Sequence, residues 1–271
     1  MDISQIAAAA EQADEAAPLD EATWLTLSHH PERVRSWVRE NAFALLVGEE
    51  LSLVVHPDAR GRGLGGELLG EVLTAYDGEL RAWSHGDHPA AAKLARATGF
   101  DRIRELWVMR RDMAKPLPPL AKRDGITVRS YEPGDADELV RVNATAFAAH
   151  PEQGAMDAAN LAERMAQKWF DPAGLLVAVE GDRMLGFHWT KRHSPELGEV
   201  YVVGIDPSAQ GRGLGKTLTL AGLHHMADGG AREVLLYVES DNEPAIAVYS
   251  GLGFGHAARD THVMYRRVSR A

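Results

Sequence analysis

Two glycine-rich stretches carry the backbone best suited to hold an anion. Residues 60–65 read Arg-Gly-Arg-Gly-Leu-Gly, and residues 210–215 read Gln-Gly-Arg-Gly-Leu-Gly. Glycine has no side chain to keep a phosphate away from the backbone, and the unpaired N–H groups of a helix's first turn point toward such an anion. Each stretch follows an apolar, β-branched run and precedes a pattern with helical spacing. We therefore expect both to be phosphate-binding turns between a strand and a helix.

Three known phosphate loops compete for these stretches. The second ends in the Gly-Lys-Thr of a nucleotide-hydrolase P-loop, but Gln210 stands where the first glycine of that motif belongs. The first fits the dinucleotide pattern G-x-G-x-x-G, but Lys216 replaces the last glycine in the second. The pattern that both share is Arg/Gln-x-x-Gly-x-Gly. It resembles the acetyl-CoA pyrophosphate loop of the GNAT acetyltransferase family.

The two stretches belong to a long internal repeat. Leu53 and Val203 open matching segments 150 residues apart, since 203 minus 53 is 150, and each copy later reaches a Gly-Phe pair. A period this long indicates duplicated domains rather than short stacked repeats. Residues 115–125 are rich in proline and charge, as linkers are. We therefore predict an N-terminal domain over 1–114, a linker over 115–125 and a C-terminal catalytic domain over 126–271.

Apolar periodicity predicts more strands in the second half than in the first. Before its glycine loop the second half reads as a strand from Ile126, helices, and strands over 175–179 and 184–191. The first half shows only the run 43–47 in that region. The resemblance implies an α/β (α+β) protein of two GNAT folds in tandem. Each would be a mixed twisted sheet flanked by helices, with the N-terminal one trimmed.

A narrower resemblance rests on five stretches of the second half. They resemble a tandem subfamily of GNAT enzymes that acetylates the cysteinyl amine of a glucosaminyl-inositol precursor. The resemblance implies acetyl-CoA as co-substrate, no metal, and a small-molecule partner, cysteinyl-glucosaminyl-inositol. The stretches are residues 146–154, 169–172, 186–191, 198–201 and 236–242.

The resemblance also implies which residues contact each substrate. Acceptor contacts are implied at Glu21, Glu152, Lys191 and Glu199. Acetyl-CoA contacts are implied at Val203, Gly204, Ile205, Gln210, Gly211, Arg212, Gly213, Leu214, Gly215, Lys216, Tyr237, Asn242, Glu243, Pro244, Ala245, Ile246 and Ala247. The corresponding first-half positions are Leu53, Val54, Val55, Gly61, Arg62, Gly63, Leu64, Gly65 and Gly66.

Two side chains are candidates for proton transfer. The acceptor amine arrives largely as an ammonium, because an α-amino group has a pKa of about 8. Glu199 is the best candidate for the base that removes its proton, directly or through water. Tyr249 matches the family's general acid, which protonates the departing thiolate. A backbone N–H of the strand 203–205 suits the developing oxyanion.

The first half keeps one of these two groups. Glu49 stands 150 residues before Glu199, and both lie in Gly-Glu pairs. Five residues before the Phe of each Gly-Phe pair, the second half has Tyr249 and the first half has Ala95. We therefore interpret the first half as a structural or cofactor-binding remnant that helps to wall the acceptor cleft.

Composition narrows the remaining classes of function. A net charge of −10 argues against broad nucleic-acid binding, and the chain has no cysteine for a disulfide or a thiolate metal site. The histidines lack a third ligand at metal spacing, and no apolar run approaches the roughly 20 residues of a membrane span. The acidic start lacks the basic region of a signal peptide. We expect a cytoplasmic monomer.

Two other functions stay open at this stage. One is a GNAT enzyme that acetylates another amine, such as an aminoglycoside or a peptide N-terminus. The other is an acyl-CoA-binding protein without turnover. Choice of acceptor separates the first from the predicted activity, and binding of acetyl-CoA without release of CoA would identify the second.

Overall fold

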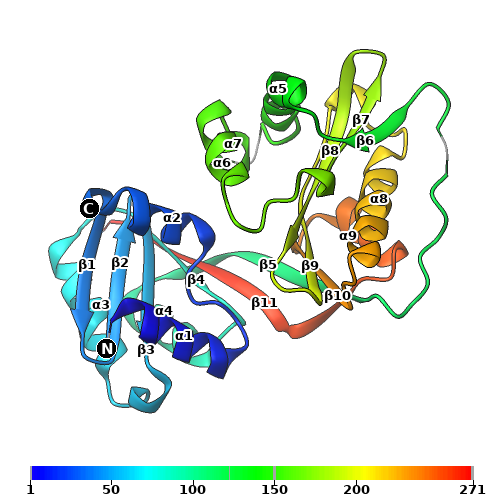
Figure 1. Cartoon of the computed structure of the whole chain (residues 1–271). Helices are drawn as coiled ribbons and strands as arrows, with labels where there is room; N and C mark the ends of the chain where they lie inside the picture. The colour runs from blue at the N-terminus through cyan, green and yellow to red at the C-terminus, as the bar shows by residue number, and fades with distance from the viewer. Residues whose placement is uncertain (1, 122, 149–150, 270–271) are drawn as a thin grey trace. The chain divides into compact units, whose positions relative to one another are not determined.

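A computed structural model describes residues 2–121, 123–148 and 151–269 of the chain (Figure 1). Contacts divide the chain into two compact units. The first unit comprises Met1–Trp107 with Ala257–Ala271, and the second comprises Val108–His256. The linker over 115–125 and the domain bounds on either side of it stay predictions, because this division by contacts does not test whether the domains are independent. Each unit is a mixed sheet flanked by helices, which confirms the predicted fold class.

The first unit has helices on both faces of its sheet. Alternation along β2 produces this arrangement, because successive side chains of a strand point to opposite faces. Ala44 and Leu46 pack with Leu68 and Val72 of α3, whereas Phe43 packs with the α1 residues. The sheet order is β1-β2-β3-β4-β11. The elements are α1 (Ile3–Asp14), α2 (Glu21–His29), η1 (Pro31–Arg33), β1 (Val34–Arg39), β2 (Ala42–Val47), β3 (Glu50–Val55), η2 (Pro57–Ala59), α3 (Leu64–Ala75), β4 (Leu80–Ser84), α4 (Pro89–Thr98) and, in part, β5 (Asp101–Asp112) and β11 (Gly255–Arg267).

Before the run that leads into the first glycine loop, the sequence predicted only the strand over 43–47. The structure adds strand β1 ahead of it. It reads Val-Arg-Ser-Trp-Val-Arg and pairs with β2 along its whole length. None of its residues is buried, because it lies at the end of the strand order. An edge strand needs no apolar alternation, so the pattern did not reveal it. Within the described residues, the first unit nonetheless lacks a counterpart of β6, the outermost strand of the second unit.

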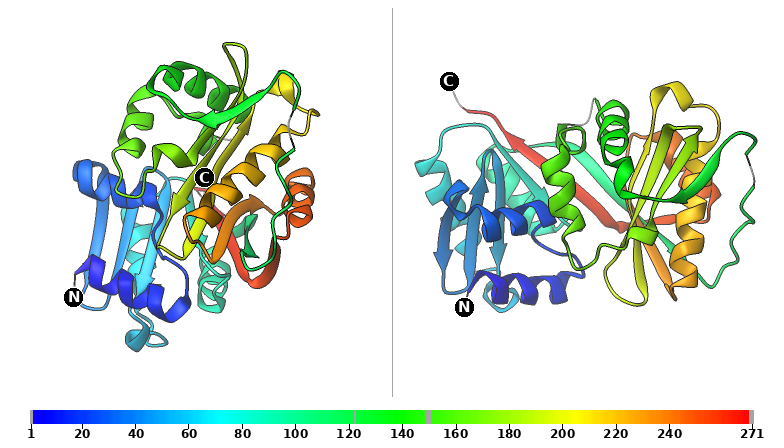
Figure 2. Two further views of the ribbon diagram at one scale, coloured as in Figure 1. Left: turned by 45° about the vertical axis from the view of Figure 1, so that its right-hand side comes forward. Right: turned by 45° about the horizontal axis from the view of Figure 1, so that its top comes forward.

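The second unit also separates its sheet faces by alternation. Helices lie on both faces of its sheet (Figure 2). On β8, Phe187 and Trp189 pack with α5, whereas His188 lies against Gly222 of α8. The strand order is β5-β10-β9-β8-β7-β6. The elements are β6 (Thr127–Ser130), η3 (Pro133–Asp135), α5 (Ala136–Ala146), α6 (Pro151–Gly154), α7 (Ala158–Met165), η4 (Pro172–Gly174), β7 (Leu175–Glu180), β8 (Arg183–Arg192), β9 (Leu197–Ile205), η5 (Pro207–Ala209), α8 (Leu214–Asp228), β10 (Glu233–Glu239) and α9 (Glu243–Gly251).

Adjacent parallel strands separate in both units. In the second unit β9 and β10 pair from Leu197 to Val200, and among the described residues no pairing continues beyond that point. β9 stays paired with β8 as far as Ile205. In the first unit, the pairing of β3 with β4 is confined, over the part of the chain that the structure describes, to Glu50 and Arg81. Backbone groups on one edge of β9 are thereby left available to a ligand just before the glycine loop.

Candidate active site

Both glycine loops have the conformation that an anion site requires. Gly211 and Gly213 have φ values of +77° and +73°, and Gly61 and Gly63 have +74° and +89°. Other residues avoid this left-handed region. Gly213 and Gly63 are the N-caps of α8 and α3, and neither helix has a side-chain cap hydrogen bond. The first-turn N–H groups of both helices are therefore available to a phosphate.

Asp206 fixes the entry to the second loop. Its carboxylate accepts hydrogen bonds from Ser208 and from Nη1 of Arg141, the latter over 2.7 Å. These bonds, led by that from the Ser208 hydroxyl, hold the pKa of Asp206 well below its usual range. Arg141 also donates to the carbonyl of Met184 on β8. The loop therefore starts from an anchored position at the end of β9.

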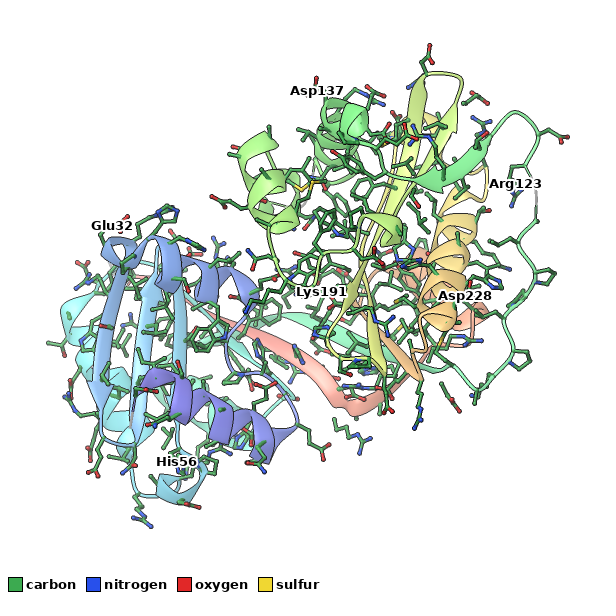
Figure 3. The ribbon with its side chains drawn as sticks, in the orientation of Figure 1. Glu32, His56, Arg123, Asp137, Lys191 and Asp228 are labelled. Carbon is green, nitrogen blue, oxygen red and sulfur yellow. The ribbon has the colours of Figure 1, made fainter. Side chains whose placement is uncertain are left out.

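The charges around the two loops differ. No acidic side chain lies in the first turn of α8, all of which the structure describes, whereas Glu67 lies in the first turn of α3. A Cβ atom placed on Gly213 would come within 2.7 Å of Nη2 of Arg123, and one placed on Gly63 would lie 3.6 Å from Glu67. Arg123 belongs to the segment predicted as a linker and is labelled in Figure 3. The second loop therefore has a cation beside it, and the first has an anion.

Sequence reasoning missed Arg123 because only the folded path of the linker brings it to the loop. The one available signal was a basic residue close before β6, which is weak by itself. Arg212, a predicted cofactor contact, pairs with Glu180 over 2.7 Å. Its charge is therefore partly balanced within the protein. Lys216, in the first turn of α8, is exposed.

Lys191 and Glu199 lie directly opposite each other on β8 and β9. Cross-strand partners of this kind share one face of a sheet. The register shifts between Trp189 and Thr190, so that β9 has one extra residue, Tyr201, at this point, as at a β-bulge. The ring of Tyr201 packs against Trp189, at a centroid distance of 5.9 Å. The sheet thus brings together two predicted acceptor contacts on an aromatic face.

The aromatic side chains of this face form a packed support. Trp169 lies 5.1 Å from Tyr201 and 5.9 Å from Trp189 between ring centroids, and Trp189 is fully buried. Nζ of Lys191 lies 4.7 Å from the centroid of the Trp169 ring and 5.0 Å from that of Tyr201. Cation–π contact favours such a position for an ammonium group. These rings hold Lys191 at the end of β8 that neighbours Glu199.

Glu199 is a buried carboxylate, with 5% of its surface exposed. Its Oε2 lies 2.6 Å from Nε2 of His193, in the turn between β8 and β9. Leu235 pairs with Glu199 on the other side, one residue before the last pair of β9 with β10. The predicted base therefore lies where the parallel strands begin to separate. Sequence reasoning missed His193, although its spacing of two from Lys191 was a signal for a shared strand face.

Tyr249 lies in α9, where its ring is 6.0 Å from that of Phe254. Burial raises the pKa of Tyr249 to about 12. The phenol therefore keeps its proton throughout the neutral range. Its predicted role as a proton donor to the thiolate requires this state.

The remaining predicted contacts of the second unit lie on accessible segments. Asn242 caps α9 by accepting a hydrogen bond from the N–H of Ala245. Tyr237 is 43% exposed and lies beyond the last β9–β10 pair. The side chain of Glu152 lies outside the described residues. Glu21 opens α2 of the first unit and is described only within that unit.

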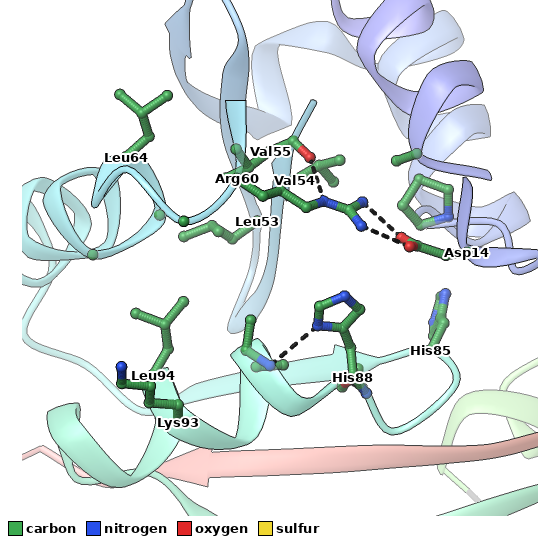
Figure 4. A pocket seen from close by; sticks show the side chains of 18 of the residues that line it. Asp14, Leu53, Val54, Val55, Arg60, Leu64, His85, His88, Lys93 and Leu94 are labelled. Carbon is green, nitrogen blue, oxygen red and sulfur yellow. Dashed lines mark hydrogen bonds and ion pairs between the residues drawn. The ribbon is translucent and has the colours of Figure 1, made fainter. Parts of the chain in front are cut away.

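The first glycine loop lines a cavity of about 500 Å³ (Figure 4). Of the predicted first-half contacts, only Arg62 is not among its lining residues. Arg60, at the position of Gln210, pairs through two hydrogen bonds with Asp14 and donates to the carbonyl of Val55. The predicted contacts in the lining are Leu53, Val54, Val55, Gly61, Gly63, Leu64, Gly65 and Gly66.

Glu49, the first-unit counterpart of Glu199, lies in different surroundings. Glu49 is half-exposed and pairs with Arg81 over 3.2 Å. Ala95, at the position of Tyr249, is buried in the core beneath α4. The first unit therefore holds a ligand-sized cavity without a buried base or a phenol at the matching positions.

Comparison with known proteins supplies the family. The acetyltransferase (GNAT) family matches residues 23–100 and 142–254, one segment in each half. The chain belongs to the GNAT acetyltransferase family. Its members transfer acetyl groups from acetyl-CoA, which confirms the predicted class of enzyme.

Relatives with closely similar sequences share one name. The chain is 66% identical to a mycothiol acetyltransferase of Nocardioides sp., over 98% of this chain and 96% of the relative. It is 48% identical to a mycothiol acetyltransferase of Actinosynnema mirum, over 96% and 93% of the two chains. The predicted resemblance to this subfamily is thereby confirmed.

Solved structures share the tandem fold. A tandem GNAT protein from the clavulanic acid biosynthesis pathway matches with a TM-score of 0.73 and 21% identity, over 98% of this chain and 94% of that one. A GCN5-related N-acetyltransferase from Sphaerobacter thermophilus matches with a TM-score of 0.69 and 21% identity, over 99% and 92%. At such identities these matches support the fold alone. Among the described residues, no helix has the length and apolar character to span a membrane.

Proposed function

We propose that the protein transfers the acetyl group of acetyl-CoA to the cysteinyl amine of 1D-myo-inositol 2-(L-cysteinylamino)-2-deoxy-glucopyranoside, giving mycothiol and CoA. The observation that carries this proposal is the 66% identity to a mycothiol acetyltransferase over nearly the whole of both chains. The paired positions of Lys191 and Glu199 support it, because both were predicted as acceptor contacts. The proposed setting is a monomer in the cytoplasm.

In this proposal the second glycine loop binds the pyrophosphate of acetyl-CoA. The N–H groups at the start of α8 and the side chains of Lys216 and Arg123 supply the positive field. The unpaired edge of β9, from residue 203 to 205, binds the pantetheine amides. Tyr237 and the first turns of α9, residues 242–247, complete the contacts.

Glu199 starts the proposed reaction by accepting a proton from the cysteinyl ammonium. The freed nitrogen lone pair attacks the thioester carbonyl carbon, and a backbone N–H of β9 stabilises the resulting oxyanion. Collapse of this intermediate breaks the carbon–sulfur bond. Tyr249, whose raised pKa keeps the phenol protonated at neutral pH, donates its proton to the CoA thiolate, and the extra proton of the acetylated nitrogen returns to the phenolate to leave the neutral amide.

Acceptor recognition is assigned to charged side chains. Lys191 offers three donors to sugar or inositol hydroxyls, and Glu21 and Glu152 offer acceptors. Glu199 contacts the amine itself. These side chains suit a polyhydroxyl amine better than an apolar one.

The first glycine loop is proposed as a second binding place for CoA, without turnover. Its cavity and its free helix N-terminus support binding. The exposed Glu49 and the apolar Ala95 argue against catalysis there.

A CoA-release assay with a panel of amines tests the proposed function. We expect thiol release from acetyl-CoA with cysteinyl-glucosaminyl-inositol at a kcat/KM well above that with aminoglycosides or peptide N-termini. A clear preference for another amine would assign a different GNAT activity. Tight binding of acetyl-CoA without release of CoA for any amine would identify a binding protein.

A further inference from the structure

The buried carboxylate of Glu199 is hydrogen-bonded to a histidine side chain. Nε2 of His193 lies 2.6 Å from Oε2, a short distance for a nitrogen–oxygen bond and typical of a charge-assisted one. An ionised carboxylate accepts hydrogen bonds only, so the ring nitrogen is the donor. The bond occupies Oε2, and Oε1 is the oxygen left for a substrate proton.

The turn between β8 and β9 sets the position of the His193 ring. The N–H of His193 donates to the carbonyl of Leu197 over 3.0 Å, which closes the turn. The Ser194 hydroxyl accepts from the N–H of Leu197 over 3.1 Å and supports the same turn. The His193 side chain is 36% exposed, whereas that of Glu199 is 7% exposed. The imidazole thus covers the carboxylate and has its outer side in water.

We propose that His193 is a positioning residue that donates from Nε2 to Oε2 of Glu199 and so holds this carboxylate with Oε1 directed at the acceptor amine. The inference rests on the acetyl transfer proposed above. A buried polar group without a hydrogen-bond partner carries the full cost of desolvation, so the bond from Nε2 stabilises the carboxylate in this orientation. His193 therefore acts through Glu199, before the nitrogen attacks.

Two other cations lie around the aromatic cluster beside this carboxylate. Lys191 lies opposite Glu199 on β8, with its ammonium over the rings of Trp169 and Tyr201. Arg164 of α7 donates to the Tyr201 hydroxyl over 3.1 Å. Next to Glu199 on β10 lies Leu235, which is apolar. Lys191 and Arg164 contact the aromatic rings, whereas His193 forms a hydrogen bond with the carboxylate.

Kinetics of His193→Ala and His193→Gln in the full chain test the inference. We expect His193→Ala to lower kcat at pH 7 by about 10- to 100-fold, the effect of losing a hydrogen bond to a charged group. The KM for acetyl-CoA should stay unchanged. The loss should shrink at pH 9, where the acceptor already carries a free amine. His193→Gln keeps an N–H donor and should recover most of kcat, and added imidazole should partly restore His193→Ala.

Ser194→Ala is the matched control, since it disturbs the same turn without touching the carboxylate. Both variants are first compared with wild type in thermal unfolding. If Ser194→Ala lowers kcat as much as His193→Ala, or if His193→Ala has wild-type kcat, the inference is overturned. It is also overturned if neither glutamine nor imidazole restores activity. A wild-type protein that releases no CoA with any amine would overturn the proposed function, and this inference with it.

Discussion

The two glycine loops of this chain follow the same backbone path. Each begins with a three-residue 3₁₀ turn, passes through two left-handed glycines and enters a helix whose N-cap has no side-chain bond. Their surroundings differ: the second has Arg123 beside Gly213, and the first has Glu67 beside Gly63. The second also follows a buried carboxylate, whereas the carboxylate ahead of the first is exposed and paired. A repeat can therefore preserve the geometry for binding an anion while the groups that perform chemistry are confined to one copy.

The largest difference in activity should come from replacing the matching glycine of each loop by glutamate. Gly213→Glu adds bulk and negative charge where the pyrophosphate approaches, and we expect a loss of activity of about 100-fold or more, as when oriented backbone donors are lost. Gly63→Glu should leave catalysis largely intact. Both glycines have positive φ, so the backbone strain is similar, although a side chain at 213 also meets Arg123, at 2.7 Å from the Cβ position. Steady-state kinetics on variants shown to be folded decide the outcome, and equal losses would contradict a single active half.

Glu199 and Glu49, which hold matching positions in the two halves, should give the next largest difference in kcat. Glu199→Gln should lower kcat by about 100- to 10,000-fold at neutral pH, the usual effect of removing a general base. Partial recovery is expected at higher pH, because solution then supplies the free amine. Glu49→Gln is the control and should retain wild-type kcat. A pH–rate profile of Glu199→Gln that matches wild type would remove Glu199 from the mechanism.

Tyr249→Phe should lower kcat by about 100-fold and leave acetyl-CoA affinity unchanged, because the hydroxyl acts on the departing thiolate. Burial raises the pKa of Tyr249 to about 12, so the phenol stays mostly protonated up to about one pH unit below that value. Wild-type kcat should accordingly show no decline from loss of this proton between pH 8 and about 11. A dominant change in acetyl-CoA affinity instead would identify Tyr249 as a binding or packing residue.

Arg123→Ala should have the smallest effect. We expect the KM for acetyl-CoA to rise by about 3- to 10-fold, because an exposed contact between charges is worth only about 1 kcal/mol. The KM for acetyl-pantetheine, which lacks the pyrophosphate, should not change. Lys115→Ala in the same segment is the control. An equal rise for both acetyl donors would show that Arg123 supports the loop rather than the phosphate.

Local patterns in the sequence were sufficient to predict the glycine loops and most of the strands. Left-handed turns demand glycine, and buried strands such as 175–180 and 183–192 demand apolar runs, so both leave a trace in single stretches of sequence. β1 left none, because an exposed edge strand has few buried positions to fill. The contacts of Arg123 and His193 depend on the path of a linker and on the register of a hairpin. Neither is encoded by spacing alone.

Strand β11 has a consequence for the order in which this protein folds during synthesis. Its residues Val263–Arg267 pair with Leu80–Ser84 of the first unit, yet the ribosome makes them after the whole second unit. At about 5–20 residues per second, synthesis of the roughly 150 residues between Trp107 and Ala257 takes about 7 to 30 seconds, during which the edge of β4 lacks this partner strand. An open strand edge invites pairing with other chains. Nascent chains of this protein should therefore be most prone to aggregation late in translation, when the second unit is complete and the first is not.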